Sequence, residues 1–190
     1  TSSYAQAAAM AMGRAMDDVI ISAATGTSFT GETGSTSTVL PSAQKITEGS
    51  TAGLTIAKLR TAKQTFDLNS VDPSIPRFII VSPRQINDLL GTTEVTSSDF
   101  NTVKALANGE INSFLGFNFI VSNRLSIASS KRLCIAFAQD GITLAVGKDV
   151  QARIDERADK SYATQVYYCM SIGATRMEEE KIVSIEAHEA

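Results

Sequence analysis

The sequence FIIVSPRQINDLLG, at residues 78–91, begins the stretch that decides the fold of this chain. The stretch continues as VTSSDFNTVKALANGEI at residues 95–111 and FLGFNFIVSNRL at residues 114–125. Buried-strand runs, capped helices and glycine turns follow one another every few residues along it. None of it presents the chemical groups that an enzyme needs, such as a nucleophile with a base in reach. The stretch therefore predicts architecture and no catalytic chemistry.

The first part of this stretch predicts a strand followed directly by a short helix. Phe78–Val81 is a continuous apolar run, which is typical of a strand covered on both faces. Ser82 has the position of a helix N-cap, Pro83 that of the first helical residue, and Gln85 completes a capping box. The inner side of the expected helix is apolar and is formed by Ile86, Leu89 and Leu90.

A further helix and strand are predicted in the rest of the stretch. From about Ser98, one side of a helix is apolar, through Phe100, Val103, Leu106 and Ala107. Asn108-Gly109 ends this helix, and Phe117–Val121 predicts another strand. Because strands and helices do not alternate regularly along the chain, the pattern favours an α+β fold over a doubly wound sheet.

The N-terminal part predicts a helix and then a polar segment. Apolar residues at three- and four-residue spacing predict a helix over residues 4–24, and Arg14 can pair with Asp18 one turn later. The packed face of this helix is expected to consist of Met12, Met16, Val19, Ile20 and Ala23. Residues 25–53 are rich in Gly, Ser and Thr and carry too little apolar surface to order themselves, which predicts a functional or mobile loop.

A helix is also predicted to begin after Thr55. Its apolar stripe consists of Ile56, Leu59, Ala62 and Phe66. The opposite, basic side is expected to face water through Lys58, Arg60 and Lys63.

The pattern of the C-terminal half predicts mainly strands. Leu133–Ala138 and Ile142–Val146 are expected to form a hairpin through Gln139-Asp140-Gly141, because Asp-Gly is a strong hairpin-turn signal. Val150, Ala152 and Ile154 alternate with polar residues, which predicts a strand with one buried face. The long pattern from Tyr162 to Ile172 predicts an extended hairpin whose aromatic and Gln positions are used for contact. Residues 181–187 predict a final strand.

Charge and reactive residues argue against several classes of function. The 190-residue chain has 17 basic and 20 acidic residues, and a net charge of −3 gives no long-range attraction for nucleic acid or anionic membranes. Cys134 and Cys169 lie in apolar runs and are expected to be buried free thiols, with a disulfide as the alternative. His188, the single histidine, is expected in a frayed tail, which leaves no triad or zinc site. We predict no catalytic, cofactor-binding or metal-binding residue, no cofactor and no membrane-spanning segment.

Several runs of this sequence resemble those of the major capsid (coat) proteins of tailed bacteriophages. The resemblance covers nearly all of residues 1–187 and is weakest over the Gly/Ser/Thr-rich segment. It is a resemblance of running sequence that includes no catalytic motif. The most similar runs are Val81–Pro83 with Asn87–Gly91, Thr102–Leu106 with Asn108–Glu110, Gly116-Phe117, Leu144–Gly147, Arg153–Arg157, and Gly173–Arg176 with Glu179–Val183.

The resemblance implies the Hong Kong 97-type shell fold. On that basis a peripheral (P) domain would comprise residues 1–52 with 148–178, namely the end of a spine helix, the Gly/Ser/Thr loop and a long β-hairpin. An axial (A) domain with a central sheet and flanking helices would comprise residues 53–147 with 179–190. The N-terminal arm and extended loop of the family have no counterpart before residue 4, so we expect an N-terminally truncated subunit.

The resemblance also implies a function and partners. We expect a non-enzymatic subunit of an icosahedral phage or prophage capsid, which forms pentamers and hexamers around double-stranded DNA that it contacts weakly. Scaffold or portal proteins are further expected partners, with assembly in the bacterial cytoplasm and a final location in the virion. Two alternatives stay open: an encapsulin-type shell protein of a bacterial compartment, and a small α/β ligand-binding domain or enzyme with a Gly-rich lid.

Overall fold

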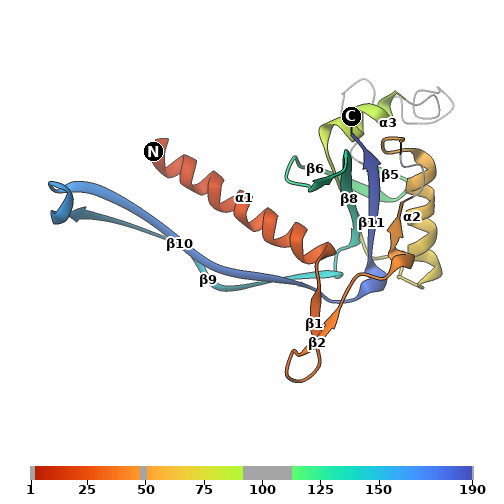
Figure 1. Ribbon diagram of the computed structural model, residues 1–190, viewed down its shortest axis with the longest axis horizontal. Helices are drawn as coiled ribbons and strands as arrows, with labels where there is room; N and C mark the ends of the chain where they lie inside the picture. The colour runs from red at the N-terminus through yellow and green to blue at the C-terminus, as the bar shows by residue number, and fades with distance from the viewer. Residues whose placement is uncertain (1–2, 48–50, 92–112, 190) are drawn as a thin grey trace.

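A computed structural model describes residues 3–47, 51–91 and 113–189, and the helix predicted from Ser98 lies outside these residues. The molecule consists of a body from which a long helix and a two-stranded arm project on the same side (Figure 1). This mixture of helices with a sheet-rich body confirms the predicted α+β class.

The body is built on a mixed sheet, which has seven strands within the described residues. β4 (Arg77–Val81) lies between β6 (Phe117–Val121), to which it is parallel, and β8 (Lys131–Ala138), to which it is antiparallel. β11 (Ile182–His188) pairs antiparallel with the other side of β8. Three short strands complete the sheet: β3 (Lys45–Ile46) beside β11, β5 (Ser113–Phe114) beside β6, and β7 (Ile127–Ala128) beside β8. The strands predicted at 78–81 and 117–121 are thus confirmed.

The helix α2 (Ile56–Leu68) covers one face of the sheet. Its predicted stripe is confirmed, because Leu59, Ala62 and Phe66 are fully buried and Ile56 is partly buried. The Phe66 ring lies 5.9 Å from that of Phe117, which anchors the helix on β6. Thr55 is the N-cap of α2, as predicted, and its hydroxyl accepts a hydrogen bond from the backbone N–H of Lys58.

Lys58 itself corrects the prediction that the basic residues of α2 all face water. Its side chain is only 4% exposed. The ammonium nitrogen Nζ donates to the carbonyl oxygens of Ala52, Gly53 and Glu186 at 2.9, 3.0 and 2.8 Å. Burial lowers the pKa of Lys58 below its ordinary value. Arg60 and Lys63 are exposed, as expected.

The helix α3 (Pro83–Leu90) begins at Pro83 as predicted, but its expected capping box is wrong. Ser82 is the N-cap residue and makes no side-chain capping bond. Its hydroxyl instead contacts Glu189 Oε1 at 3.4 Å. The buried Gln85 amide oxygen accepts a hydrogen bond from the backbone N–H of Leu54 at 2.8 Å. Both side chains therefore serve long-range contacts, which sequence spacing cannot reveal.

The expected hairpin through Gln139-Asp140-Gly141 is also wrong. A tight turn does form there, since the N–H of Gly141 donates to the carbonyl oxygen of Ala138 at 2.9 Å. The chain then leaves the body sheet, and β9 (Ile142–Arg157) pairs with β10 (Ala163–Arg176) and not with β8. One side of β8 pairs with β11, and the other side pairs with β4 and β7, so no edge remains for β9.

Residues 25–47, the described part of the Gly/Ser/Thr-rich segment before Thr51, are more ordered than their composition predicts. They contain a small hairpin of β1 (Ser28–Thr30) and β2 (Thr36–Thr38), the short 3-10 helix η1 (Ser42–Gln44) and β3. Leu40 and Ile46 are buried, and they tie this segment to the core. The hairpin projects from the body near the root of the arm (Figure 1).

The end of the chain is likewise held in place, so the frayed tail expected at His188 is wrong. His188 belongs to β11, and its backbone N–H donates to the carbonyl oxygen of Ala52 at 3.0 Å. Glu189 forms an ion pair with Arg132, and both side chains are largely buried. Arg132 and Ser82 favour the charged carboxylate, which lowers the pKa of Glu189.

Candidate assembly surfaces

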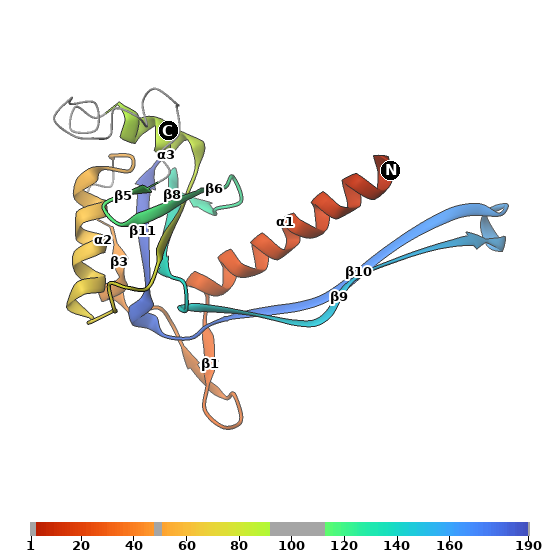
Figure 2. The same ribbon diagram turned by 180° about the vertical axis from the view of Figure 1, so that it is seen from behind.

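The arm is a two-stranded antiparallel sheet that stands apart from the body (Figures 1 and 2). β9 and β10 are joined at the tip by the 3-10 helix η2 (Ala158–Lys160). Every residue from Thr143 to Ser161 is exposed. The prediction that Val150, Ala152 and Ile154 form a buried face is therefore wrong, because within residues 3–47, 51–91 and 113–189 no layer of the body reaches these side chains.

The two faces of the arm nevertheless differ in chemistry. The strand register places Ile154 opposite Val166 and Ala152 opposite Tyr168, so these apolar side chains share one face. The other face carries the pairs Asp155–Gln165, Arg153–Tyr167 and Gln151–Cys169. Ile154 is 70% exposed. The apolar alternation in the sequence is thus real, but none of the described residues covers this face.

The long helix α1 (Ser3–Thr25) is the second projecting element. It diverges from the arm toward its N-terminal end, while its C-terminal end lies on the body (Figure 2). Its predicted packed face, which includes Met12, Met16 and Val19, is only half-buried, and full burial is confined to Ile21 and Ala24 near the body. Like the arm, α1 offers much of its surface for contacts with other molecules.

Ion pairs and a buried arginine fix the root of α1. The predicted Arg14–Asp18 pair does not form, because Arg14 donates to the carbonyl oxygen of Met10 and Asp18 instead pairs with Arg124 of the body. Arg124 Nε lies 2.7 Å from Asp18 Oδ1 and lowers the pKa of that carboxyl. Arg176, at the end of β10, is 4% exposed.

The guanidinium of Arg176 joins three elements. It donates to the carbonyl oxygens of Ala24 at 3.3 Å, Gly26 at 2.8 Å and Thr38 at 3.0 Å. The end of α1, the small β1–β2 hairpin and the arm therefore meet at one buried cation. This junction sets the directions in which the two long elements leave the body.

Comparison with known proteins gives this architecture an identity. A family profile described as phage capsid protein matches residues 1–189. The chain belongs to the phage capsid protein family. No curated protein sequence matches it.

Solved capsid structures share the fold of this capsid protein. The capsid of the cyanophage P-SCSP1u is 18% identical, with a TM-score of 0.71 over 100% of this chain and 67% of that chain. A chain of Mycobacterium phage Che8 is 19% identical, with a TM-score of 0.66 over 96% of this chain and 61% of that one. The similarity to these phage structures confirms the predicted Hong Kong 97-like fold. This chain thus spans about two thirds of the length of the capsid chains that it matches.

An encapsulin shares the same fold more distantly. The holo-SrpI encapsulin of Synechococcus elongatus is 10% identical, with a TM-score of 0.59 over 97% of this chain and 64% of that chain. At this identity the similarity concerns the fold alone, and the family match is to phage capsids. The chain is accordingly a structural capsid subunit, located in the virion shell, and not an enzyme.

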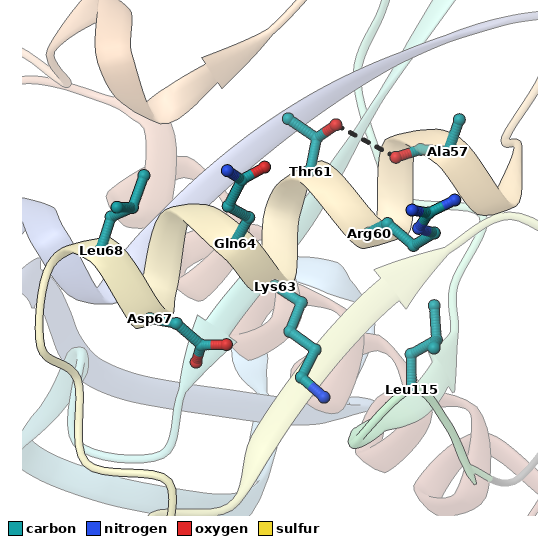
Figure 3. A pocket seen from close by; sticks show the side chains of 8 residues that line it. All are labelled: Ala57, Arg60, Thr61, Lys63, Gln64, Asp67, Leu68 and Leu115. Atoms are coloured by element: carbon teal, nitrogen blue, oxygen red, sulfur yellow. Dashed lines mark hydrogen bonds between the residues drawn. The ribbon is translucent and has the colours of Figure 1, made fainter.

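The capsid protein has an open groove of about 730 Å³ along the outer face of α2 (Figure 3). The Thr61 hydroxyl in this groove donates to the carbonyl oxygen of Ala57 at 3.1 Å, and Asp67 pairs with Arg77 at 2.9 Å. The Thr61 hydroxyl is thus paired with the backbone of its own helix. Its lining residues are Ala57, Arg60, Thr61, Lys63, Gln64, Asp67, Leu68 and Leu115.

The two cysteines are free, as predicted. Cys134 is completely buried in β8, and burial raises the pKa of its thiol to about 12. Cys169 lies on the arm and is half-buried. Within residues 3–47, 51–91 and 113–189, no group of His, Cys, Asp and Glu is arranged to hold a metal ion, and no helix is long and apolar enough to cross a membrane.

Proposed function

We propose that repeated copies of this chain form an icosahedral phage or prophage shell, arranged as pentamers and hexamers around double-stranded DNA. One observation carries the proposal: the arm exposes an apolar face, including Ile154 and Val166, on an element that the chain itself leaves uncovered. Exposed apolar surface of this kind marks an interaction site, and symmetric copies can cover it repeatedly. Family membership supports the oligomeric shell in which such contacts occur.

The proposal includes a division into a P domain (1–52 with 148–178) and an A domain (53–147 with 179–190). The projection of α1 and the arm from a sheet-centred body supports this division (Figure 1). The two parts share one sheet, because β3 from the first range pairs with β11 of the second.

We further propose weak contacts with the packaged DNA, contacts with scaffold or portal proteins, and assembly in the bacterial cytoplasm. The net charge of −3 supports a shell that does not hold its cargo tightly. The encapsulin alternative rests on the shared fold. Neighbouring genes distinguish the two: portal, protease and terminase genes indicate a phage, and a cargo enzyme gene indicates a compartment.

The test expresses the complete gene product that contains these residues and examines it by electron microscopy and sedimentation. Icosahedral particles are expected. Ile154→Asp places a charge on the apolar face and is expected to abolish particles, because burying an unpaired charge in an interface is unfavourable. Gln165→Lys is the control on the opposite face, where the new charge lies beside Asp155, and it is expected to assemble. Soluble monomers under all assembly conditions would refute the proposal.

A further inference from the structure

The N-terminal half of α1 is apolar on all sides and yet exposed. Between Ala5 and Met12, Gln6 is the single polar residue, and no charged residue precedes Arg14 in the helix. Tyr4 is 79% exposed and Met10 is 65% exposed. A helix that is apolar all round is normally buried. This half-helix therefore needs covering surface on more than one side.

The apolar face of the arm changes along its length from covered to bare. Near the root, α1 packs against β10, and Tyr168 and Met170 are half-buried there. Farther out, Val166 is 42% exposed and Ile154 is 70% exposed on the same face. The distal part thus continues a surface that already accepts an apolar helix at its root. On this face, β9 contributes alternate residues from Val150 to Glu156, and β10 contributes alternate residues from Thr164 to Tyr168. Glu156 is the single charged residue among them.

Within one chain, α1 points away from the distal part of the arm and does not cover it. Both views show α1 and the arm diverging from their common root (Figures 1 and 2). Arg176 holds the end of the helix, and the Arg124–Asp18 pair holds its side against the body. The bare part of the arm and the bare part of α1 are therefore two chemically matched surfaces that one chain leaves apart.

We propose that the N-terminal half of α1 in one copy packs on the distal apolar face of the arm in a second copy. The small Ala side chains of the helix permit close approach to Ile154 and Val166, and neither surface buries a cluster of charges. Each copy supplies a helix to one neighbour and an arm to another, so the contact is heterologous and propagates around a ring or lattice. This inference rests on the proposed shell function, because it names the surfaces that two copies share.

Photo-crosslinking between isotopically distinct copies tests the pairing. An Ile154→Cys variant in a Cys169→Ser background is labelled with benzophenone maleimide, while Cys134 stays protected by burial. The benzophenone-labelled protein is assembled with an excess of wild-type protein that is ¹⁵N-enriched and carries no benzophenone. The mixture is then irradiated and digested with trypsin. Trypsin cleaves after Arg14, and residues 1–13 contain no Lys or Arg, so residues 1–14 lie together in one tryptic peptide that ends at Arg14. The expected product joins position 154 to this peptide in its ¹⁵N form.

A Gln165→Cys variant, labelled in the same way on the opposite face, is the control and should give no such product. Two results would overturn the inference: crosslinks from position 154 to the light peptide of its own chain, or crosslinks only to other heavy peptides. If particles still form in these cases, the proposed shell function stands. A failure of the wild-type protein to form particles would remove both the inference and the proposed function. If the label at 154 alone blocks assembly, Met10→Asp should block it too, and normal assembly of Met10→Asp would overturn the pairing.

Discussion

Replacing Lys58 by Met should destabilise the body far more than any other change to the basic residues of α2. Met has a similar length but no donor, so the carbonyl oxygens of Ala52, Gly53 and Glu186 each lose the bond from Nζ. These carbonyls belong to the segment before α2 and to β11, which are far apart in the sequence. The variant therefore removes a connection between two elements and leaves the apolar stripe of the helix unchanged.

The size of the effect follows from the partners that remain. Ala52 keeps a donor, because the backbone N–H of His188 lies 3.0 Å from its carbonyl oxygen. The other two carbonyls lose a charged donor in a buried site, and each such loss costs about 1–3 kcal/mol. Relief from burying the ammonium group offsets part of this loss. We expect a net decrease of about 2–4 kcal/mol in the free energy of unfolding.

Urea unfolding of the subunit at neutral pH measures this value, with Lys63→Met as the matched control. Lys63 lies on the same helix and is exposed, so its replacement should change stability by less than about 0.5 kcal/mol. The pKa of Lys58 is lowered in the folded protein, so the unfolded chain binds more protons as the pH approaches 10.5. The wild-type protein should then gain stability relative to Lys58→Met with rising pH. Equal stability of the two Met variants at neutral pH would refute the role of Lys58.

Three further predictions concern the junction and the thiols. Arg176→Lys replaces a guanidinium that donates to three carbonyl oxygens by a single ammonium group. It should lower the free energy of unfolding by about 2–3 kcal/mol. Unchanged amide exchange in residues 24–38 would contradict this. The Asp18–Arg124 pair contributes above the ordinary carboxyl pKa and is lost as the pH falls through the lowered pKa of Asp18. The protection factors of the α1 amides, which correct for slower intrinsic exchange in acid, should therefore fall in acid in the wild-type protein and be low at neutral pH in Arg124→Ala. An identical pH profile of protection in both proteins would argue against the pair. Iodoacetamide at mild alkaline pH should modify Cys169 in the folded protein and Cys134 only in urea, because burial raises the pKa of Cys134 to about 12; mass spectrometry showing two modifications in the folded protein would disprove this protection.

Local patterns predicted the elements of the body well, because short-range physics determines them. The apolar run at 78–81, the stripe of α2 and the Pro83 helix start each depend on residues within a few positions. Lys58 and Gln85 were misassigned for the opposite reason. Their partners, Glu186 and Leu54, are distant in the sequence, and a lysine on the polar side of a helical pattern gives no sign that a strand lies over it.

The segment at residues 25–53 shows how tertiary contacts override composition. Its Gly, Ser and Thr content gives little reason to order, yet Arg176 donates to backbone carbonyls at both ends of the β1–β2 hairpin region. The charge-assisted hydrogen bonds from this buried guanidinium stabilise the segment, whose own side chains bury little apolar surface. The signal available in the sequence was an arginine at the end of a strand pattern, which is too common to identify such a site.

The arm gives the most useful disagreement between pattern and structure. An alternating strand predicts a covered face, and in a single chain Ile154 on that face is 70% exposed. An alternating pattern predicts which face is buried in the final assembly, and that face need not be buried in one subunit. The reason is that the hydrophobic effect favours burial of apolar surface whether the covering residues come from the same chain or from another. A sequence pattern that is apolar where the isolated chain is bare therefore indicates where a second molecule belongs. By the same reasoning, the apolar N-terminal half of α1 should also be covered in the assembled shell.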